Sequence, residues 1–424
     1  MYVDCYDEVM RLAVLNLSPY FCVNSAKNRC VSSNPVNKLN YSRGIPGRPQ
    51  TMPLKKQIAA HSNTSFPDVS SPVVWEMHRR ALSRLDAGLL TADLQQSVQW
   101  LQGVDSPERV DFLVHHGLAA WWADRLDHQS ALDNVPHEVC DVLVAARRTA
   151  GALYLMQSAA ISPITAALER ENVIYAVLKG VATREEAYPV PALRTAGDID
   201  LLISPSALAT ATQCITQLGF VPQSTDSTHE MTFSRGQVDI DLHWDILRPG
   251  RTRHPLVSSL LARRVRGAKF WRLSDSDTVF LMLVHPAITK YVCSRHMGLN
   301  RVLDFLLFTQ TRTIHWADVA QRLDEAGLKT AAWCTLRWIQ LLVPDATVSP
   351  VSFMAAIQPG KLRAAYLNYW VDHDLPGRLL DRANWLIQAA FTLPMHDTFA
   401  DARQAFLAKT KPDSNRFAVN ASVE

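Results

Sequence analysis

The sequence lacks several features that would place it in a specialised class of protein. It contains no run of about 18 uncharged apolar residues, so we expect no membrane-spanning helix. Its seven cysteines are odd in number and form no C-x-x-C pair, which argues against a disulfide framework or structural zinc site and favours reduced thiols in a cytoplasmic chain. An excess of one charge is also missing, because 43 basic and 40 acidic side chains leave a net charge of only +3. A protein that coats a polyanion is therefore excluded.

The remaining composition is that of a globular protein. The chain has 424 residues, 48% of them hydrophobic, which suffices for two or three domains of about 100 to 200 residues. Residues 24–71 are rich in Ser, Asn, Pro and Lys and lack regular apolar spacing, so we expect a disordered tail at 1–70 and, by composition, a flexible tail at 410–424. Acidic residues before the mildly apolar segment 12–23 argue against a signal peptide. The change in composition also suggests that translation begins at Met52 or later.

Apolar residues spaced three and four positions apart predict a helical N-terminal region over residues 71–170. One stripe, on one helix or two short ones, consists of Val110, Leu113, Val114, Leu118, Trp121, Trp122 and Leu126. His115 and His116 lie beside this stripe. Adjacent helical residues point about 100° apart and cannot easily share one metal ion, so we interpret the two histidines as a partly exposed polar edge.

Similar stripes predict a helical C-terminal domain over residues 251–409. Four polar side chains of this region could face a cleft, but solvated helix faces explain them better: His285, Lys290, His296 and Arg301. We interpret four tryptophans as core or interface anchors rather than base-stacking platforms: Trp333, Trp338, Trp370 and Trp385.

Between residues 171 and 250 the apolar periodicity changes to that of strands, which predicts a separate core. Short apolar runs alternate with helical segments, and an Arg-Gly turn joins the last two runs as a hairpin. The expected order is a strand at 173–178, a helix at 181–187, a strand at 196–203, a helix at 205–218, and hairpin strands at 228–234 and 237–247.

Acidic side chains alternate with apolar ones on two of these strands. Asp198 and Asp200 are two residues apart, so on a strand both carboxylates project from one face. Asp239, Asp241 and His243 repeat this spacing on the last strand. A solvated edge strand would also explain either pair alone. If the two strands are neighbours, however, three or four carboxylates converge in the oxygen-rich environment that Mg²⁺ prefers, and Mg²⁺ in turn implies phosphate chemistry.

Basic residues accompany the acidic ones. Lys179 and Gly180 end the first strand, where Gly180 would let backbone N–H groups approach a phosphate and Lys179 would supply a positive charge. Arg194 lies four residues before the first aspartate and could neutralise phosphate as well. His243 and His229 are secondary candidates. His243 could orient a carboxylate or contact an acceptor, and a structural hydrogen bond is an equal alternative.

Together these motifs resemble an uncharacterised bacterial nucleotidyltransferase family of the DNA polymerase beta superfamily. The resemblance covers roughly residues 75–344, and the spacing from L-K-G to D-I-D-L-L is its most specific element. It is carried by Val177 to Gly180, Tyr188, Leu193, Arg194, Gly197 to Ile203, Leu218 to Phe220, His229 and the D-I-D-L-H-W run from Asp239 to Trp244.

The resemblance implies an α+β fold in which a small mixed sheet is flanked by helices. It further implies that Asp198 and Asp200 bind the divalent ions, Mg²⁺ or Mn²⁺, that carry a nucleoside triphosphate. The superfamily's third carboxylate would be Asp241, or Asp239 if the register differs by one pair. Most of the superfamily has a Gly-Ser pair where this chain has L-K-G, so the triphosphate would be held differently.

The implied reaction transfers a nucleoside monophosphate from ATP or another nucleoside triphosphate to an acceptor, and pyrophosphate leaves. The acceptor would be a small molecule, a sugar or a protein. Nucleic acid ranks lower, because no basic stripe with interleaved aromatic residues occurs. The alternative is a catalytically inactive protein of the same fold that binds nucleotide as a regulator or scaffold.

Overall fold

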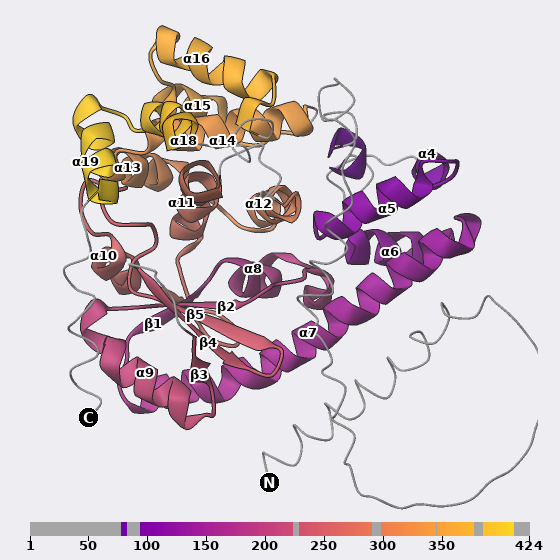
Figure 1. The fold of residues 1–424 in the computed structure, drawn as a ribbon, viewed down its shortest axis with the longest axis horizontal. Helices are drawn as coiled ribbons and strands as arrows, with labels where there is room; N and C mark the ends of the chain where they lie inside the picture. The colour runs from indigo at the N-terminus through magenta and orange to yellow at the C-terminus, as the bar shows by residue number, and fades with distance from the viewer. Residues whose placement is uncertain are drawn as a thin grey trace, which may run out of the picture. The chain divides into compact units, whose positions relative to one another are not determined.

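A computed structural model describes residues 78–82, 94–223, 229–290, 298–344, 346–376 and 385–410 (Figure 1). The expected N-terminal tail at 1–70, the suggested start at Met52 and all but the first residue of the expected tail at 410–424 lie outside the described residues. The described part is α+β, with helices before and after a mixed sheet, as the sequence predicts.

Besides the helical residues 78–82, the described part of the chain before the sheet contains α4 (Leu94–Trp100), α5 (Ser106–His115), α6 (Ala119–His128) and α7 (His137–Arg170). The predicted apolar stripe is divided between α5 and α6, because Gly117 adopts a left-handed conformation with φ of +68° between them. Except for the half-buried Val114, the residues of the stripe are buried.

The predicted polar edge is correct for His115, which is exposed, and wrong for His116, which is 5% exposed. Helix α5 ends at His115, and the turn that follows directs the ring of His116 inward against Phe112, with ring centroids 4.2 Å apart. The backbone N–H of Leu299 donates to His116 Nδ1 at 3.4 Å. Burial lowers the pKa of His116 well below its ordinary value.

Helix α7 is the one described helix that is long and apolar enough to cross a membrane by length and composition. Core helices of soluble proteins also reach these values, and 44% of its most apolar 18-residue window is buried within the protein. In Figure 1, α7 runs the length of the sheet layer, and it contacts α5, α6, α9 (Leu208–Gln217) and β5 (Val238–His243). Its apolar side chains therefore have partners inside the fold.

The sheet has seven strands in the order β3-β4-β5-β2-β1-β7-β6. Strand pairs β2/β5 and β1/β7 are parallel, and the other pairs are antiparallel. The remaining strands are β1 (Tyr175–Leu178), β2 (Ile199–Ile203), β3 (Val221–Pro222), β4 (Glu230–Arg235), β6 (Val265–Arg266) and β7 (Trp271–Arg272). The hairpin of β4 and β5 is where the sequence predicts it, although β5 ends at His243.

Three features of the sheet differ from the prediction. Strand β3 at Val221–Pro222 was not expected. Strands β6 and β7 lie in the region 251–409 that was expected to be helical, and they extend the sheet beyond β1. Strand β2 begins at Ile199, so Asp198 precedes the strand instead of lying within it. Two-residue strands carry too little alternation to be recognised from their own sequence.

The C-terminal part of the chain is otherwise helical. The helices are α8 (Lys179–Ala187) within the core, then α10 (Val257–Ala262), α11 (Asp275–His285), α12 (Asn300–Thr311), α13 (Trp316–Ala326), α14 (Lys329–Leu342), α15 (Val351–Ile357), α16 (Lys361–Asp372), α18 (Trp385–Thr392) and α19 (Phe399–Thr410). Trp333, Trp338 and Trp370 are buried, which confirms them as anchors, while the side chain of Trp385 lies outside the described residues. One continuous apolar cluster joins the N-terminal helices, β1, β2 and the C-terminal helices.

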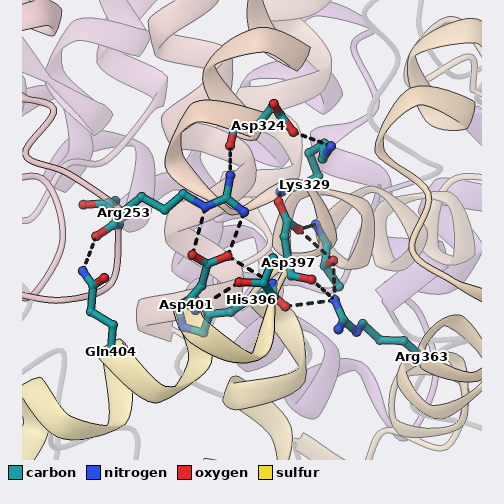
Figure 2. A network of polar contacts seen from close by, with 11 residues as sticks. Arg253, Asp324, Lys329, Arg363, His396, Asp397, Asp401 and Gln404 are labelled. Atoms are coloured by element: carbon teal, nitrogen blue, oxygen red, sulfur yellow. Dashed lines mark hydrogen bonds and ion pairs between the residues drawn. The ribbon is translucent and has the colours of Figure 1, made fainter.

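A network of polar contacts fastens the end of the chain to the turn between α13 and α14 (Figure 2). Arg253 donates to both carboxylate oxygens of Asp401 at 2.9 and 2.8 Å, and to the carbonyl oxygen of Asp324 at 2.6 Å. Arg363 donates to the carbonyl oxygens of His396 and Asp397 at 3.0 and 2.7 Å. Arg253 thus links Asp401 of α19 to Asp324 of α13.

The buried ring of His396 makes the stability of the fold sensitive to pH. Its side chain is 1% exposed, and burial, with a smaller effect from Arg251, lowers its pKa from 6.5 to about 4. Between these values the unfolded chain binds a proton that the folded chain does not, so stability falls as the pH drops from 6.5 toward 4. Between pH 7 and pH 5 this proton uptake should lower the free energy of unfolding of the wild type by about 2 kcal/mol. We expect His396→Leu to lack this decrease. Urea unfolding at both pH values measures this, and an equal loss in the two proteins would contradict it.

Candidate active site

The two acidic strands are neighbours, as the predicted site requires. Strands β2 and β5 run parallel with Asp200 directly opposite Asp241, so both side chains emerge on one face of the sheet. Oxygens of these carboxylates and a ring nitrogen of His243 lie within 4.8 Å of one another. Asp241 accepts a hydrogen bond from Thr232 at 2.7 Å, and Asp239 accepts one from Ser234 at 2.7 Å. Asp239 is therefore displaced along the strand from the Asp200–Asp241 pair.

Lys179 contacts a carboxylate of the site. It begins α8 directly after β1, and its backbone has a left-handed φ of +49°. Its Nζ donates to Asp200 Oδ1 at 2.6 Å and lies 3.3 Å from Nε2 of His243, which itself lies 2.8 Å from the same oxygen. Burial alone would raise the pKa of Asp200, but Lys179 and His243 outweigh it and hold that pKa well below its usual range. Asp200 is therefore ionised and already paired with a cation.

Asp241 has the opposite electrostatic environment. Burial raises its pKa, the hydrogen bond from Thr232 partly opposes this, and the negative charge of Asp200 raises it further. A divalent cation between the two carboxylates would remove this repulsion. Asp198, half-buried just before β2, is not part of this cluster but lines the adjacent cavity together with Asp200. These oxygen donors fit Mg²⁺ or Mn²⁺.

A cavity of about 280 Å³ opens beside Asp198 and Asp200. One wall comes from the end of β1, the start of α8 and the segment before β2, and the opposite wall comes from α11 and α12. The cavity is lined by all five predicted site residues that precede β3 in the sequence: Lys179, Gly180, Arg194, Asp198 and Asp200. Asp241, Asp239, His243 and His229 do not line it; Asp241 and His243 reach the site from the other side of Asp200.

Arg194 is held by the opposite wall of the cavity. Its guanidinium donates to both oxygens of Asp304 on α12, at 2.6 to 3.2 Å, and Tyr188 donates to the same carboxylate at 2.7 Å. Burial would lower the pKa of Arg194, but Asp304 overcomes this and raises it. Gly180 lies so close that an added Cβ would be 3.1 Å from Arg194 Nη1. Gly180 thus allows the start of α8 to pack against Arg194, whose charge is already balanced.

The cavity also contains two residues for which the sequence analysis favoured solvated helix faces over a cleft. Arg301 and His285 line the cavity, although both were attributed to solvated helix faces. That interpretation is wrong for His285, which is 7% exposed, and for Arg301, whose pKa is lowered by burial and then by the nearby Arg194. Lys290's side chain and His296 lie outside the described residues. Asp304 lies three residues after Arg301 and therefore on the same face of the helix. This spacing of two charged residues is the sequence feature that could have indicated the second wall of the cavity.

The two remaining histidines lie beyond Asp241. His243 is 2% exposed, and its Nδ1 is 3.1 Å from Glu230 Oε2. His229 is 8% exposed, with Nε2 3.5 Å from the same oxygen. Burial lowers the pKa of His229 to about 4, with Glu230 acting in the opposite direction. Both histidines contact carboxylates, and neither lines the cavity, although His243 touches the lining residues Asp200 and Lys179.

One comparison with known proteins identifies a family. No curated protein matches the chain significantly. A sequence model of a family described as an uncharacterised nucleotidyltransferase matches residues 102–344, more than half of the chain, including both acidic strands and both cavity walls. The chain therefore belongs to this uncharacterised nucleotidyltransferase family.

Proposed function

We propose that the protein transfers a nucleoside monophosphate from a nucleoside triphosphate to an acceptor, with release of pyrophosphate. The observation that carries this proposal is the parallel register of Asp200 and Asp241 next to a cavity with basic side chains. A carboxylate cluster beside cationic groups is the arrangement that phosphoryl transfer requires, because catalysis there consists of positioning and charge stabilisation.

In this proposal Asp198, Asp200 and Asp241 hold Mg²⁺ or Mn²⁺. When bound, the ions would offset charge on the transferring phosphate. Lys179 has two roles: it balances Asp200 in the absence of an ion, and from its place in the cavity lining it can turn toward a phosphate. Arg301 faces the same cavity and makes no ion pair with a described residue, so its charge is available to an anion.

The acceptor binds on the side of Asp241 that faces away from Lys179, where Asp241 assists removal of the acceptor proton. A small molecule, a sugar or a protein side chain fits the proposal better than nucleic acid, since the net charge is only +3. We further propose a cytoplasmic location, which the free cysteines Cys140, Cys214 and Cys334 support, as does the intracellular supply of nucleoside triphosphates.

One observation favours the alternative of an inactive, nucleotide-binding regulator or scaffold. The ion pair of Lys179 with Asp200, at 2.6 Å with side chains 19% and 6% exposed, already supplies the positive charge that a metal ion would bring. If Lys179 does not leave Asp200, the carboxylates cannot take up the ion, and the cavity would bind nucleotide without turnover.

An assay with each of the four α-labelled nucleoside triphosphates decides between the two. The purified chain is incubated with Mg²⁺ or Mn²⁺ and with extract of its host as the pool of acceptors. We expect one nucleotide to give a labelled product that depends on the metal ion. Nucleotide binding in calorimetry without any labelled product would support the inactive alternative, and the absence of both would contradict both.

A further inference from the structure

His229, Glu230 and His243 form a second cluster of metal-ligand type beside the proposed active site. One ligand atom from each lies within 4.8 Å of the other two. Glu230 is directly opposite His243 in the antiparallel pair of β4 and β5, so both side chains leave the sheet on the same face. The backbone N–H groups of Trp244 and Asp245 donate to the carbonyl oxygen of His229 at 3.0 and 3.3 Å, which fixes His229 at the end of β5.

The spacing within this cluster suits a transition metal. Zn²⁺ lies about 2.0 to 2.2 Å from nitrogen and oxygen ligands, which puts neighbouring ligand atoms about 3.0 to 3.5 Å apart in tetrahedral or octahedral geometry. Glu230 Oε2 is 3.1 Å from His243 Nδ1 and 3.5 Å from His229 Nε2. Two imidazoles with one carboxylate favour Zn²⁺ over Mg²⁺, which prefers oxygen ligands.

His243 provides a second, independent observation. Its side chain is 2% exposed, yet Nδ1 makes no hydrogen bond with any described residue, because Glu230 lies close but outside hydrogen-bond geometry. A buried ring nitrogen in this position is costly unless it has a partner. The other nitrogen, Nε2, lies 2.8 Å from Asp200 Oδ1. If Nε2 carries the hydrogen and donates it to Asp200, the lone pair of Nδ1 is directed to the cluster.

We infer that His229, Glu230 and His243 bind one Zn²⁺ ion, separate from the Mg²⁺ or Mn²⁺ of the proposed transfer reaction. The ion completes the polar contacts of His243 and keeps Nε2–H directed at Asp200, in the manner of carboxylate–histidine–zinc arrangements. It also joins the start of β4 to the end of β5. Zinc binding here does not depend on nucleotide transfer.

Calorimetric titration of the metal-free full-length chain with Zn²⁺, in the presence of excess Mg²⁺, tests this inference. We expect one tight site per chain in the wild type. His229→Ala and Glu230→Gln each remove a ligand and should weaken zinc binding at least about 100-fold. Asp241→Asn, which changes a proposed Mg²⁺ ligand and none of the zinc ligands, should retain the site. With Co²⁺ in place of Zn²⁺, the visible absorption of the bound ion should disappear in the same two variants.

Circular dichroism of each variant establishes that it is folded, and Glu230→Gln serves if His229→Ala does not fold. An unchanged zinc affinity in folded His229→Ala or Glu230→Gln would overturn the inference. So would a loss of zinc binding in Asp241→Asn, because that would place the ion at the Asp200–Asp241 pair. If the wild type binds no zinc, the inference fails as well.

Discussion

Asp200→Asn should reduce nucleotidyl transfer by about 1,000-fold or more while leaving the protein folded. The substitution preserves the shape of the side chain but removes the charge that holds the divalent ion. Loss of roughly 4 kcal/mol of charge stabilisation in the transition state corresponds to about three factors of ten in rate. Initial rates of label transfer under saturating nucleotide measure the effect, once the labelled product of the wild type has been found.

Asp239→Asn is the matched control for this prediction. It makes the same chemical change on a neighbouring strand, but Asp239 accepts a hydrogen bond from Ser234 and is not part of the cluster of Asp200 and Asp241. We expect a change in rate of less than about 10-fold, since no ion ligand is lost. Equal losses in both variants would show that Asp239, and not only Asp241, completes the site. Full activity in Asp200→Asn would refute the proposed metal site.

Asp304→Ala should lower the free energy of unfolding by about 3 to 5 kcal/mol. Asp304 and Arg194 are 7% and 9% exposed at the side chain and are joined by three hydrogen bonds. Removing the carboxylate leaves the guanidinium buried without its counter-charge and leaves the hydroxyl of Tyr188 without its acceptor. Urea unfolding, followed by tryptophan fluorescence and far-UV circular dichroism, measures the change.

Asp324→Ala is the control for Asp304→Ala. Asp324 also pairs with a basic residue, Lys329, at 2.5 Å, but its side chain is 61% exposed. Exposed ion pairs contribute about 0 to 1 kcal/mol, so this substitution should have a small effect. A loss below about 1 kcal/mol in Asp304→Ala would mean that Arg194 finds water or another partner when Asp304 is absent.

The sequence was most informative where one local pattern determines the geometry. Alternation of acidic and apolar residues correctly placed β5, where Val238, Ile240 and Leu242 are buried and Asp239 and Asp241 are half-buried, because a strand with one more buried face tolerates only one register. In β2, where all five residues are buried, the alternation located the strand but wrongly included Asp198. It also put Asp200 and Asp241 on strands that the structure shows to be neighbours. The roles of Asp198, Lys179, Gly180 and Arg194 stay predictions, although all four line the cavity with Asp200.

Other parts of the site depend on contacts between distant segments. Arg194 and Asp304 are 110 residues apart, and no local periodicity links them. Arg301 and His285 have the polar character of ordinary solvated helix positions, so only the tertiary structure, in which α12 packs against α8, reveals that they face a cavity. Strands β6 and β7 are too short for alternation and form only because β1 offers an edge.

The origin of the two cavity walls has a consequence for protein synthesis. When the ribosome has added Leu247, both acidic strands and Arg194 are complete, but α11 and α12 have not been made. Until Asp304 follows, Arg194 lacks its counter-charge and the cavity has only one side. The cavity beside the carboxylates therefore gains its second wall only after more than two thirds of the chain has been translated.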